Sequence, residues 1–232
     1  MELDDYLKLE THFAAAYGRC SDQTMTSPER MFAVWQAVEH INAQKIVGDV
    51  VECGVWRGGS TMLAAMAFDH FGDQDRNYWL YDTYEGMPPA DDVDVVAVSG
   101  DKASNILANQ SKNEDNPYWA IASLDVVQAN MGRTGQPADR FHYVKGMVED
   151  TLPATMPDEI ALLRLDTDWY ASTMHELVHL WPRLTTGGVV IIDDYGFWEG
   201  ARKAVEDYFA QRDDRPFLAR IDVTGRMAVK TG

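Results

Sequence analysis

Short apolar runs alternate with longer amphipathic segments along most of this 232-residue chain, and no other feature constrains the fold as much. The apolar runs favour strands, and apolar residues at helical spacing favour helices between them. Strands joined through helices are typical of parallel βαβ units in a doubly wound sheet. We therefore predict an α/β fold with strands over 48–55, 77–83, 141–146, 159–168 and 187–195, helices over 28–43, 60–71, 173–184 and 200–212, and a closing antiparallel hairpin over 216–221 and 226–230.

The chain length suits one α/β domain, so we expect residues 1–232 to fold as a single unit. Its first part, 1–45, is predicted to be an N-terminal helical segment, in which Ser27 and Pro28 mark the start of a helix. The segment 91–140 interrupts the alternation and has one helical stretch, over 120–131. We expect it to be an insertion that either covers the substrate site as a lid or wall, or runs over the surface.

The formal net charge is −17, from 20 basic and 37 acidic residues. This charge opposes binding to nucleic acids and to anionic membrane surfaces. No apolar run approaches the ~20 residues that span a bilayer, the N-terminus has no signal pattern, and the two cysteines form no recognisable pair motif. We expect a cytoplasmic protein that acts on a small molecule, with no nucleic-acid or membrane partner.

Aspartates follow two predicted strands at the edge of the sheet where ligands bind in this architecture. The stretch GVVIIDDYG places Asp193 and Asp194 side by side after a buried strand, and Asp166 and Asp168 follow the preceding strand. Mutual repulsion and desolvation disfavour such a group unless a cation is present. Oxygen ligands without Cys or His suit Mg²⁺, with Mn²⁺ or Ca²⁺ as alternatives. We predict a metal site here; the alternative is that these aspartates only cap turns.

A glycine-rich turn, VVECGVWRGGS over 50–60, lies between a predicted strand and a predicted helix. It lacks both the G-x-G-x-x-G pattern and the Gly-Lys-Ser/Thr of a P-loop. Its acidic-x-Gly-x-x-x-Gly spacing suits S-adenosylmethionine (SAM), and Asp82 after the next strand would accept hydrogen bonds from the ribose. Arg57 suits the ligand carboxylate, or else a surface ion pair. The alternative to a SAM site is a purely structural turn.

The segment HELVH, from His175 to His179, matches the H-E-x-x-H pattern of zinc hydrolases. The apolar stripe of this helix is expected to contain Met174, Leu177, Val178, Trp181 and Leu184. A stripe in that place puts both histidines on a flank of the helix, away from its packed face. Pro182 also interrupts the helix soon afterwards. We predict a structural helix and keep a zinc hydrolase as the alternative function.

Several segments together resemble the macrocin O-methyltransferase (TylF-type) family, which includes enzymes that methylate sugar hydroxyls of mycinamicin, tylosin and novobiocin. The segments are GDVVECGVWRGGS, YDTYEGMP, VKGMVEDTLP, LRLDTDWYAST and LWPRLTTGGVVIIDDYGFWEGARKAVEDYF. The resemblance runs from about Met25 to Phe209 and is weakest in the insertion. It implies a Rossmann-like SAM-dependent methyltransferase fold, SAM and Mg²⁺ as cofactors, and frequent assembly into homo-oligomers.

By position, the resemblance also implies roles for individual residues. Metal ligands would be Asp166, Asp193 and Asp194, with Asp168 as catalytic base. The SAM site would contain Glu52, Gly54, Arg57, Gly58, Gly59, Ser60, Asp82, Gly146, Met147 and Glu149. Met147 replaces an aromatic residue expected on the adenine side.

The implied reaction is methylation of a hydroxyl on a sugar or glycosylated metabolite. Mg²⁺ would favour the alkoxide of the acceptor, and Asp168 would take the proton. A non-catalytic SAM-binding protein is the other alternative, and the presence of all four aspartates argues against it.

Overall fold

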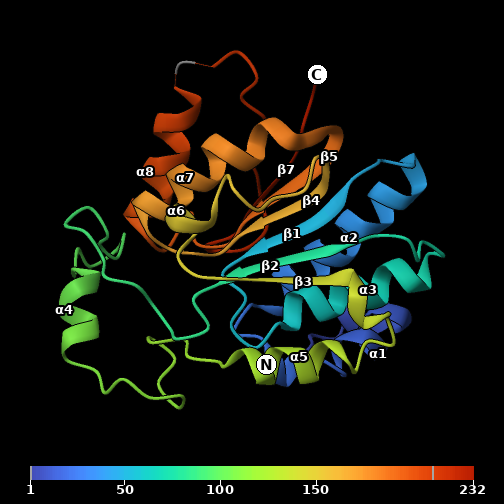
Figure 1. Ribbon diagram of the computed structural model, residues 1–232, viewed down its shortest axis with the longest axis horizontal. Helices are drawn as coiled ribbons and strands as arrows, with labels where there is room; N and C mark the ends of the chain where they lie inside the picture. Colours follow the sequence, from blue (N-terminus) through green and yellow to red (C-terminus); the bar gives the residue numbers. More distant parts are fainter. Residues whose placement is uncertain (1, 211) are drawn as a thin grey trace.

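A computed structural model describes residues 2–210 and 212–232, and it contains a seven-stranded sheet with helices on both faces (Figure 1). The strand order is β3-β2-β1-β4-β5-β7-β6; β1 to β5 are parallel, and β7 runs antiparallel to both β5 and β6. The strands are β1 (Asp49–Cys53), β2 (Tyr78–Asp82), β3 (Phe141–Lys145), β4 (Ile160–Leu165), β5 (Leu184–Ile192), β6 (Ala219–Arg220) and β7 (Arg226–Val229). The predicted doubly wound α/β fold with a C-terminal antiparallel hairpin is confirmed.

The α-helices are α1 (Thr11–Tyr17), α2 (Pro28–Gln44), α3 (Gly59–His70), α4 (Ala103–Ala108), α5 (Leu124–Met131), α6 (Val148–Thr151), α7 (Tyr170–Leu180) and α8 (Glu199–Phe209). The 3₁₀ turns are η1 (Leu7–Leu9), η2 (Ser21–Gln23), η3 (Ala138–Arg140) and η4 (Trp181–Arg183). Gln211, within the helix predicted over 200–212, lies outside the described residues. No helix in the described ranges combines the length and apolar character needed to cross a membrane.

Successive residues of the central strands enter two separate apolar cores. Val50 and Leu162 pack with residues of α1, α2, α3 and α5, whereas Val51 and Leu163 pack with residues of α6, α7 and α8. The two groups of helices cover opposite faces of the sheet (Figure 1). Because both faces are covered, the parallel strands contain almost uninterrupted apolar residues, as expected for buried parallel sheets. Polar residues therefore collect where these strands end.

The α2 helix agrees with its predicted form, whereas the α7 helix differs from it. The α2 helix begins as predicted, with Pro28 in its first turn and the Ser27 side chain accepting a hydrogen bond from the Arg30 amide at 3.2 Å. The α7 helix begins at Tyr170 and ends at Leu180, and Pro182 lies in the 3₁₀ turn that follows it. Its predicted apolar stripe is wrong at one position, because Val178 is 46% exposed while Glu176 is fully buried.

The predicted insertion over 91–140 packs against the rest of the fold through its helices α4 and α5, among other contacts. Its α5 is shorter than predicted, because it starts after Ser123, whose side chain accepts a hydrogen bond from the Val126 amide. Val127 and Met131 of α5 join the core around α3. The α4 helix, which the sequence did not predict, instead joins a small apolar cluster with Trp169 and Trp198. Whether the insertion acts as a lid stays a prediction.

Candidate active site

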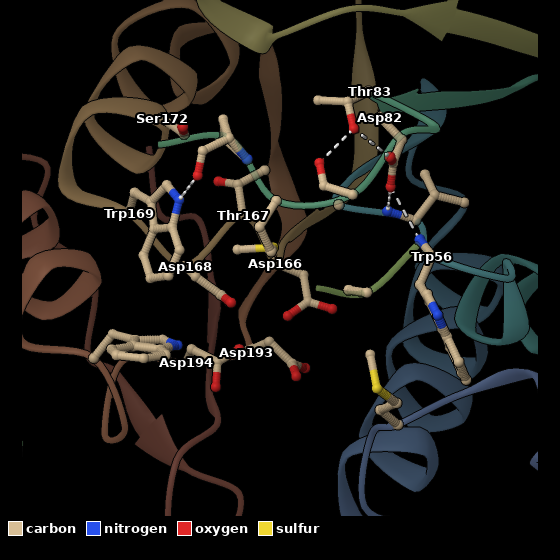
Figure 2. Close-up of a pocket in the computed structure, with 18 of the residues that line it drawn as sticks. Trp56, Asp82, Thr83, Asp166, Thr167, Asp168, Trp169, Ser172, Asp193 and Asp194 are labelled. Carbon is tan, nitrogen blue, oxygen red and sulfur yellow. Dashed lines mark hydrogen bonds between the residues drawn. The ribbon is translucent and has the colours of Figure 1, made fainter. Parts of the chain in front are cut away.

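A cavity of about 470 Å³ opens at the carboxyl ends of the parallel strands (Figure 2). The strand ends supply Gly54, Asp82, Gly146, Asp166 and Asp194 to its wall. The insertion supplies Ala103, Ile106, Leu107, Pro117, Tyr118 and Ala120. Ligands bind at this edge in open α/β sheets, so the cavity is the candidate active site.

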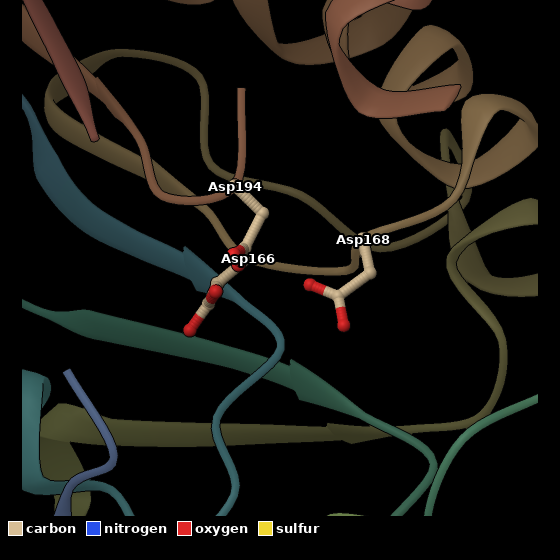
Figure 3. Close-up of side chains that lie close together, drawn as sticks. All are labelled: Asp166, Asp168 and Asp194. Carbon is tan, nitrogen blue, oxygen red and sulfur yellow. The ribbon is translucent and has the colours of Figure 1, made fainter. Parts of the chain in front are cut away.

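Three aspartates converge in this cavity from the loops after β4 and β5 (Figure 3). One carboxylate oxygen from each of Asp166, Asp168 and Asp194 lies within 4.8 Å of the others. Strand register explains the convergence: Leu165 pairs with Ile192 in adjacent parallel strands, so the residues that follow the two strands leave the sheet together. The Asp166 amide also bonds to the carbonyl of Cys53 at 2.8 Å, which ties the first aspartate to β1.

The geometry of Asp168 is unusual for a non-glycine residue. Its φ is +69°, and the amide of Trp169 bonds to the carbonyl of Thr167 at 2.8 Å across it. This three-residue turn with a positive central φ is rare and strained, and such strain gathers at functional sites. Burial, and then repulsion from Asp166, raise the pKa of Asp168 to about 8. A carboxyl with a pKa near neutrality is suited to exchanging a proton with a substrate.

The fourth aspartate, Asp193, faces two arginines. Its side chain forms ion pairs with Arg30 of α2 and with Arg164 of β4, the latter at 2.8 Å. Its two carboxylate oxygens each face one guanidinium group: Oδ1 faces Nη2 of Arg164, and Oδ2 faces Nη1 of Arg30. The structure therefore brings Asp168, rather than Asp193, into the closest group with Asp166 and Asp194.

The acidic group fits a divalent cation. Burial raises the pKa of both Asp166 and Asp194 well above its usual range, and repulsion among the neighbouring aspartates adds to this effect. A cation would relieve that repulsion, and the donors are all hard carboxylate oxygens. Which three aspartates bind the ion stays a prediction.

Arg164 connects the acidic group to the glycine-rich turn. Its Nη1 lies 2.7 Å from Oε1 of Glu52 and 2.8 Å from Oδ2 of Asp166, and its Nη2 donates to Thr26 at 2.8 Å. Glu52 also accepts a hydrogen bond from Thr61 and is 2% exposed. Glu52 therefore lies behind the cavity wall, as a partner of Arg164, and is not among the residues that line the cavity; its predicted place in the SAM site stays a prediction.

The glycine-rich turn is held against the next strand end by Asp82. Its Oδ2 accepts hydrogen bonds from the amides of Val55 at 2.7 Å and Trp56 at 3.0 Å (Figure 2). Gly54 has a φ of +80°, and a Cβ there would lie 2.0 Å from the carbonyl oxygen of Asp166. Only glycine fits this position without displacing the acidic loop.

The remaining residues of the predicted SAM site separate into two groups. Those that line the cavity are Gly59, Ser60, Gly146, Met147 and Glu149. Two others lie outside the lining: Arg57 stacks on the Trp56 ring at 4.8 Å, and a Cβ on Gly58 would meet Met131 of α5. The role of Arg57 as a partner of the ligand carboxylate stays a prediction.

Some cavity residues were not predicted from the sequence. They include the segment 23–26, Arg30, Thr83, Trp169, Ser172, Phe197 and Trp198. Ser172 donates a hydrogen bond to Oε1 of the predicted site residue Glu149 at 2.8 Å. The LDTDWYAST segment was a usable signal for Trp169 and Ser172. No local pattern marks Arg30, which reaches the site from the N-terminal helical segment.

The HELVH histidines do not form a zinc site with a third ligand. The rings of His175 and His179 are 4.4 Å apart, and Nε2 of His175 lies 3.2 Å from the carbonyl oxygen of Leu152. Among the described residues, the aspartate group is the only cluster of three or more His, Cys, Asp or Glu with metal-binding geometry. The zinc hydrolase alternative therefore has no geometric support.

Comparison with known proteins gives a consistent result. A family model described as macrocin-O-methyltransferase (TylF) matches residues 17–229. The chain is 36% identical over 202 residues to a tetracenomycin-type rhamnosyl 4'-O-methyltransferase of Streptomyces olivaceus, and 34% identical over 202 residues to the mycinamicin III 3''-O-methyltransferase of Micromonospora griseorubida. Each match covers 87% of this chain, and 73% and 76% of the respective relatives. The solved structure of the O-methyltransferase NovP superposes with a TM-score of 0.79 at 28% identity, covering 99% of this chain and 100% of that one.

Proposed function

The chain belongs to the macrocin O-methyltransferase (TylF) family and is a SAM-dependent O-methyltransferase, and we propose that it methylates a sugar hydroxyl of a glycosylated natural product with the help of Mg²⁺. The sugar as acceptor is supported by the S. olivaceus relative, whose name contains a rhamnosyl group and a 4' position, and by the 3'' position in the name of the M. griseorubida relative. The observation that carries the metal dependence is the convergence of Asp166, Asp168 and Asp194 within 4.8 Å. Self-association stays a prediction from the resemblance.

SAM supplies an electrophilic methyl group when it is bound, and the turn after β1 is the proposed place for its methionine part. Gly54, Gly59 and Ser60 leave room at this wall of the cavity. The carboxylate of Asp82, which already orders the turn through two amides, is proposed to accept hydrogen bonds from the ribose. In this arrangement the methyl group would face the aspartates across the cavity (Figure 2).

Mg²⁺, when bound, supplies Lewis acidity that lowers the pKa of a coordinated hydroxyl. We propose Asp166, Asp193 and Asp194 as its ligands, of which Asp166 and Asp194 already face one another. The Asp168 carboxylate would accept the proton of the acceptor hydroxyl as the O–CH₃ bond forms and the S–CH₃ bond of SAM breaks, which leaves S-adenosylhomocysteine. Its contribution is expected to be ~10²–10⁴-fold in rate. Trp169 and Trp198, which pack edge to face at 5.0 Å, would limit the entry of water on this side.

The metal and base roles are separable by experiment. Methyl transfer from SAM to a glycosylated acceptor should be lost in EDTA and restored by Mg²⁺. Asp168→Asn should keep Mg²⁺ and SAM binding by calorimetry while turnover falls by ~10²–10⁴-fold. Asp193→Asn should instead weaken Mg²⁺ binding if Asp193 is a ligand.

Full activity in EDTA would refute the metal mechanism. Weakened Mg²⁺ binding in Asp168→Asn, with normal binding in Asp193→Asn, would exchange the roles of the two aspartates.

A further inference from the structure

One buried group in the HELVH segment is unused by the proposed reaction. Glu176 of α7 is fully buried, and its Oε1 accepts a hydrogen bond from Oγ1 of Thr167 at 2.9 Å. Thr167 stands between Asp166 and Asp168 and lines the cavity. The carboxyl of Glu176 thus contacts the acidic loop from behind, on the side away from the cavity.

Glu176 is an unfavourable choice for stability alone. Its neighbours Leu177 and Leu180 are also fully buried, and Oε2 of Glu176 has no conventional N–H or O–H hydrogen-bond donor among the residues that the structure describes. The buried thiol of Cys53 is the other side chain that interacts with this carboxyl. Burial raises the pKa of this carboxyl well above its usual range. An apolar residue of similar size would avoid the desolvation penalty of such a group. A local choice that opposes stability is expected where function requires it.

We infer that Glu176 is a positioning residue that holds the Asp166–Asp168 loop in its working geometry through Thr167. The three-residue turn at Asp168, with φ of +69°, is strained and persists only if its surroundings fix it. The Thr167–Glu176 hydrogen bond joins that turn to the rigid α7 helix. Residues that orient metal ligands through hydrogen bonds commonly affect metal affinity and the rate of the reaction. The inference rests on the proposed roles of Asp166 and Asp168.

The test removes the Thr167–Glu176 hydrogen bond in two ways. The single variants leave one of the two partners unpaired, whereas the double variant leaves neither. Glu176→Leu and Thr167→Val each remove one partner, and the double variant removes both with little change in shape. Glu176→Gln keeps an acceptor oxygen. Val178→Thr, at an exposed position on the same helix, is the matched control.

We expect the double variant to melt at or above the wild-type temperature, yet to bind Mg²⁺ about 10-fold or more weakly and to lose roughly 10- to 100-fold in kcat. Its SAM affinity should stay within about 2-fold, because the SAM contacts are on other strands. Glu176→Gln and Val178→Thr should stay within about 3-fold of wild type in Mg²⁺ affinity and kcat. The double variant should be no worse than the poorer single variant, since both single variants break the same bond.

Wild-type Mg²⁺ affinity and kcat in the double variant would overturn the inference. Weaker SAM binding to the same extent as Mg²⁺ binding would also overturn it, because that result indicates a general structural role. A wild-type protein that binds Mg²⁺ but transfers no methyl group would refute the proposed function, and the Mg²⁺ affinities would still decide this inference. If methyl transfer does not require a metal, the kcat of the double variant tests the inference about Glu176: a wild-type kcat would overturn it.

Discussion

Replacement of Arg164 by Met should destabilise the fold strongly, although Met keeps an unbranched side chain that can fill part of the same space. Arg164 is 4% exposed, and its guanidinium pairs with Glu52, Asp166 and Asp193 at 2.7 to 2.8 Å. Glu52 and Asp193 are each only 2% exposed, so water cannot replace the lost partner without entering the core. Arg164→Met therefore leaves two buried carboxylates without their shared cation.

The size of the effect follows from that geometry. Removing one partner of a buried ion pair costs about 3–5 kcal/mol, mainly through the uncompensated charge that remains. Arg30 still pairs with Asp193, which limits the effect there, whereas Glu52 keeps only the hydrogen bond from Thr61. We therefore expect a loss of about 3–5 kcal/mol in the free energy of unfolding. For a domain of this size, that corresponds to a fall of roughly 6–20 °C in Tm.

The loss should also depend on pH. Burial already raises the pKa of Glu52, and Arg164 is the main opposing influence. Without Arg164 the folded-state pKa rises further above the unfolded value, so the folded protein holds this proton over a wider pH range. Stability then falls as pH rises between the two pKa values. The destabilisation by Arg164→Met should accordingly be smaller at pH 5 than at pH 8.

Urea denaturation followed by circular dichroism, at both pH values, measures these quantities. Arg202→Met is the control, because Arg202 forms an exposed pair with Glu199 at 3.7 Å and should change stability by less than about 1 kcal/mol. Adding Glu52→Gln to Arg164→Met should recover part of the loss. A loss below about 1 kcal/mol in Arg164→Met, or one that is larger at pH 5, would refute this reasoning.

Two further substitutions examine the cofactor turn. Asp82→Ala should weaken SAM binding by about 1–3 kcal/mol in calorimetry, as expected for a lost charge-assisted hydrogen-bond site, and unchanged affinity would remove Asp82 from the site. Gly54→Ala should lower both Tm and Mg²⁺ affinity, because the new Cβ would lie 2.0 Å from the Asp166 carbonyl oxygen. Gly100→Ala is its control, with a φ of +75° but nothing within 4 Å, and equal effects of the two substitutions would show that backbone strain alone is responsible.

Local sequence patterns were sufficient to predict the α/β fold and the edge on which the polar residues gather. An uninterrupted apolar run, such as the one before Asp193, indicates a strand that is buried on both faces. Such a run can be recognised from neighbouring residues alone. Because parallel strands end at the same edge, the order of strands and aspartates along the chain was enough to place Asp166 and Asp194 close together. The start of α2 was equally local, since Ser27 caps the helix that Pro28 begins.

The pairing of the side chains at that edge, in contrast, depends on tertiary packing. Arg30 and Asp193 are 163 residues apart in the sequence, and Glu52 and Arg164 are 112 apart, so no short pattern indicates either contact. The burial of Glu176 likewise contradicts the apolar stripe of its helix, and its carboxyl accepts a hydrogen bond from Thr167 in the loop that precedes α7. Periodicity describes which face of an element is apolar, whereas the partner of a buried charge is fixed only when distant elements pack together.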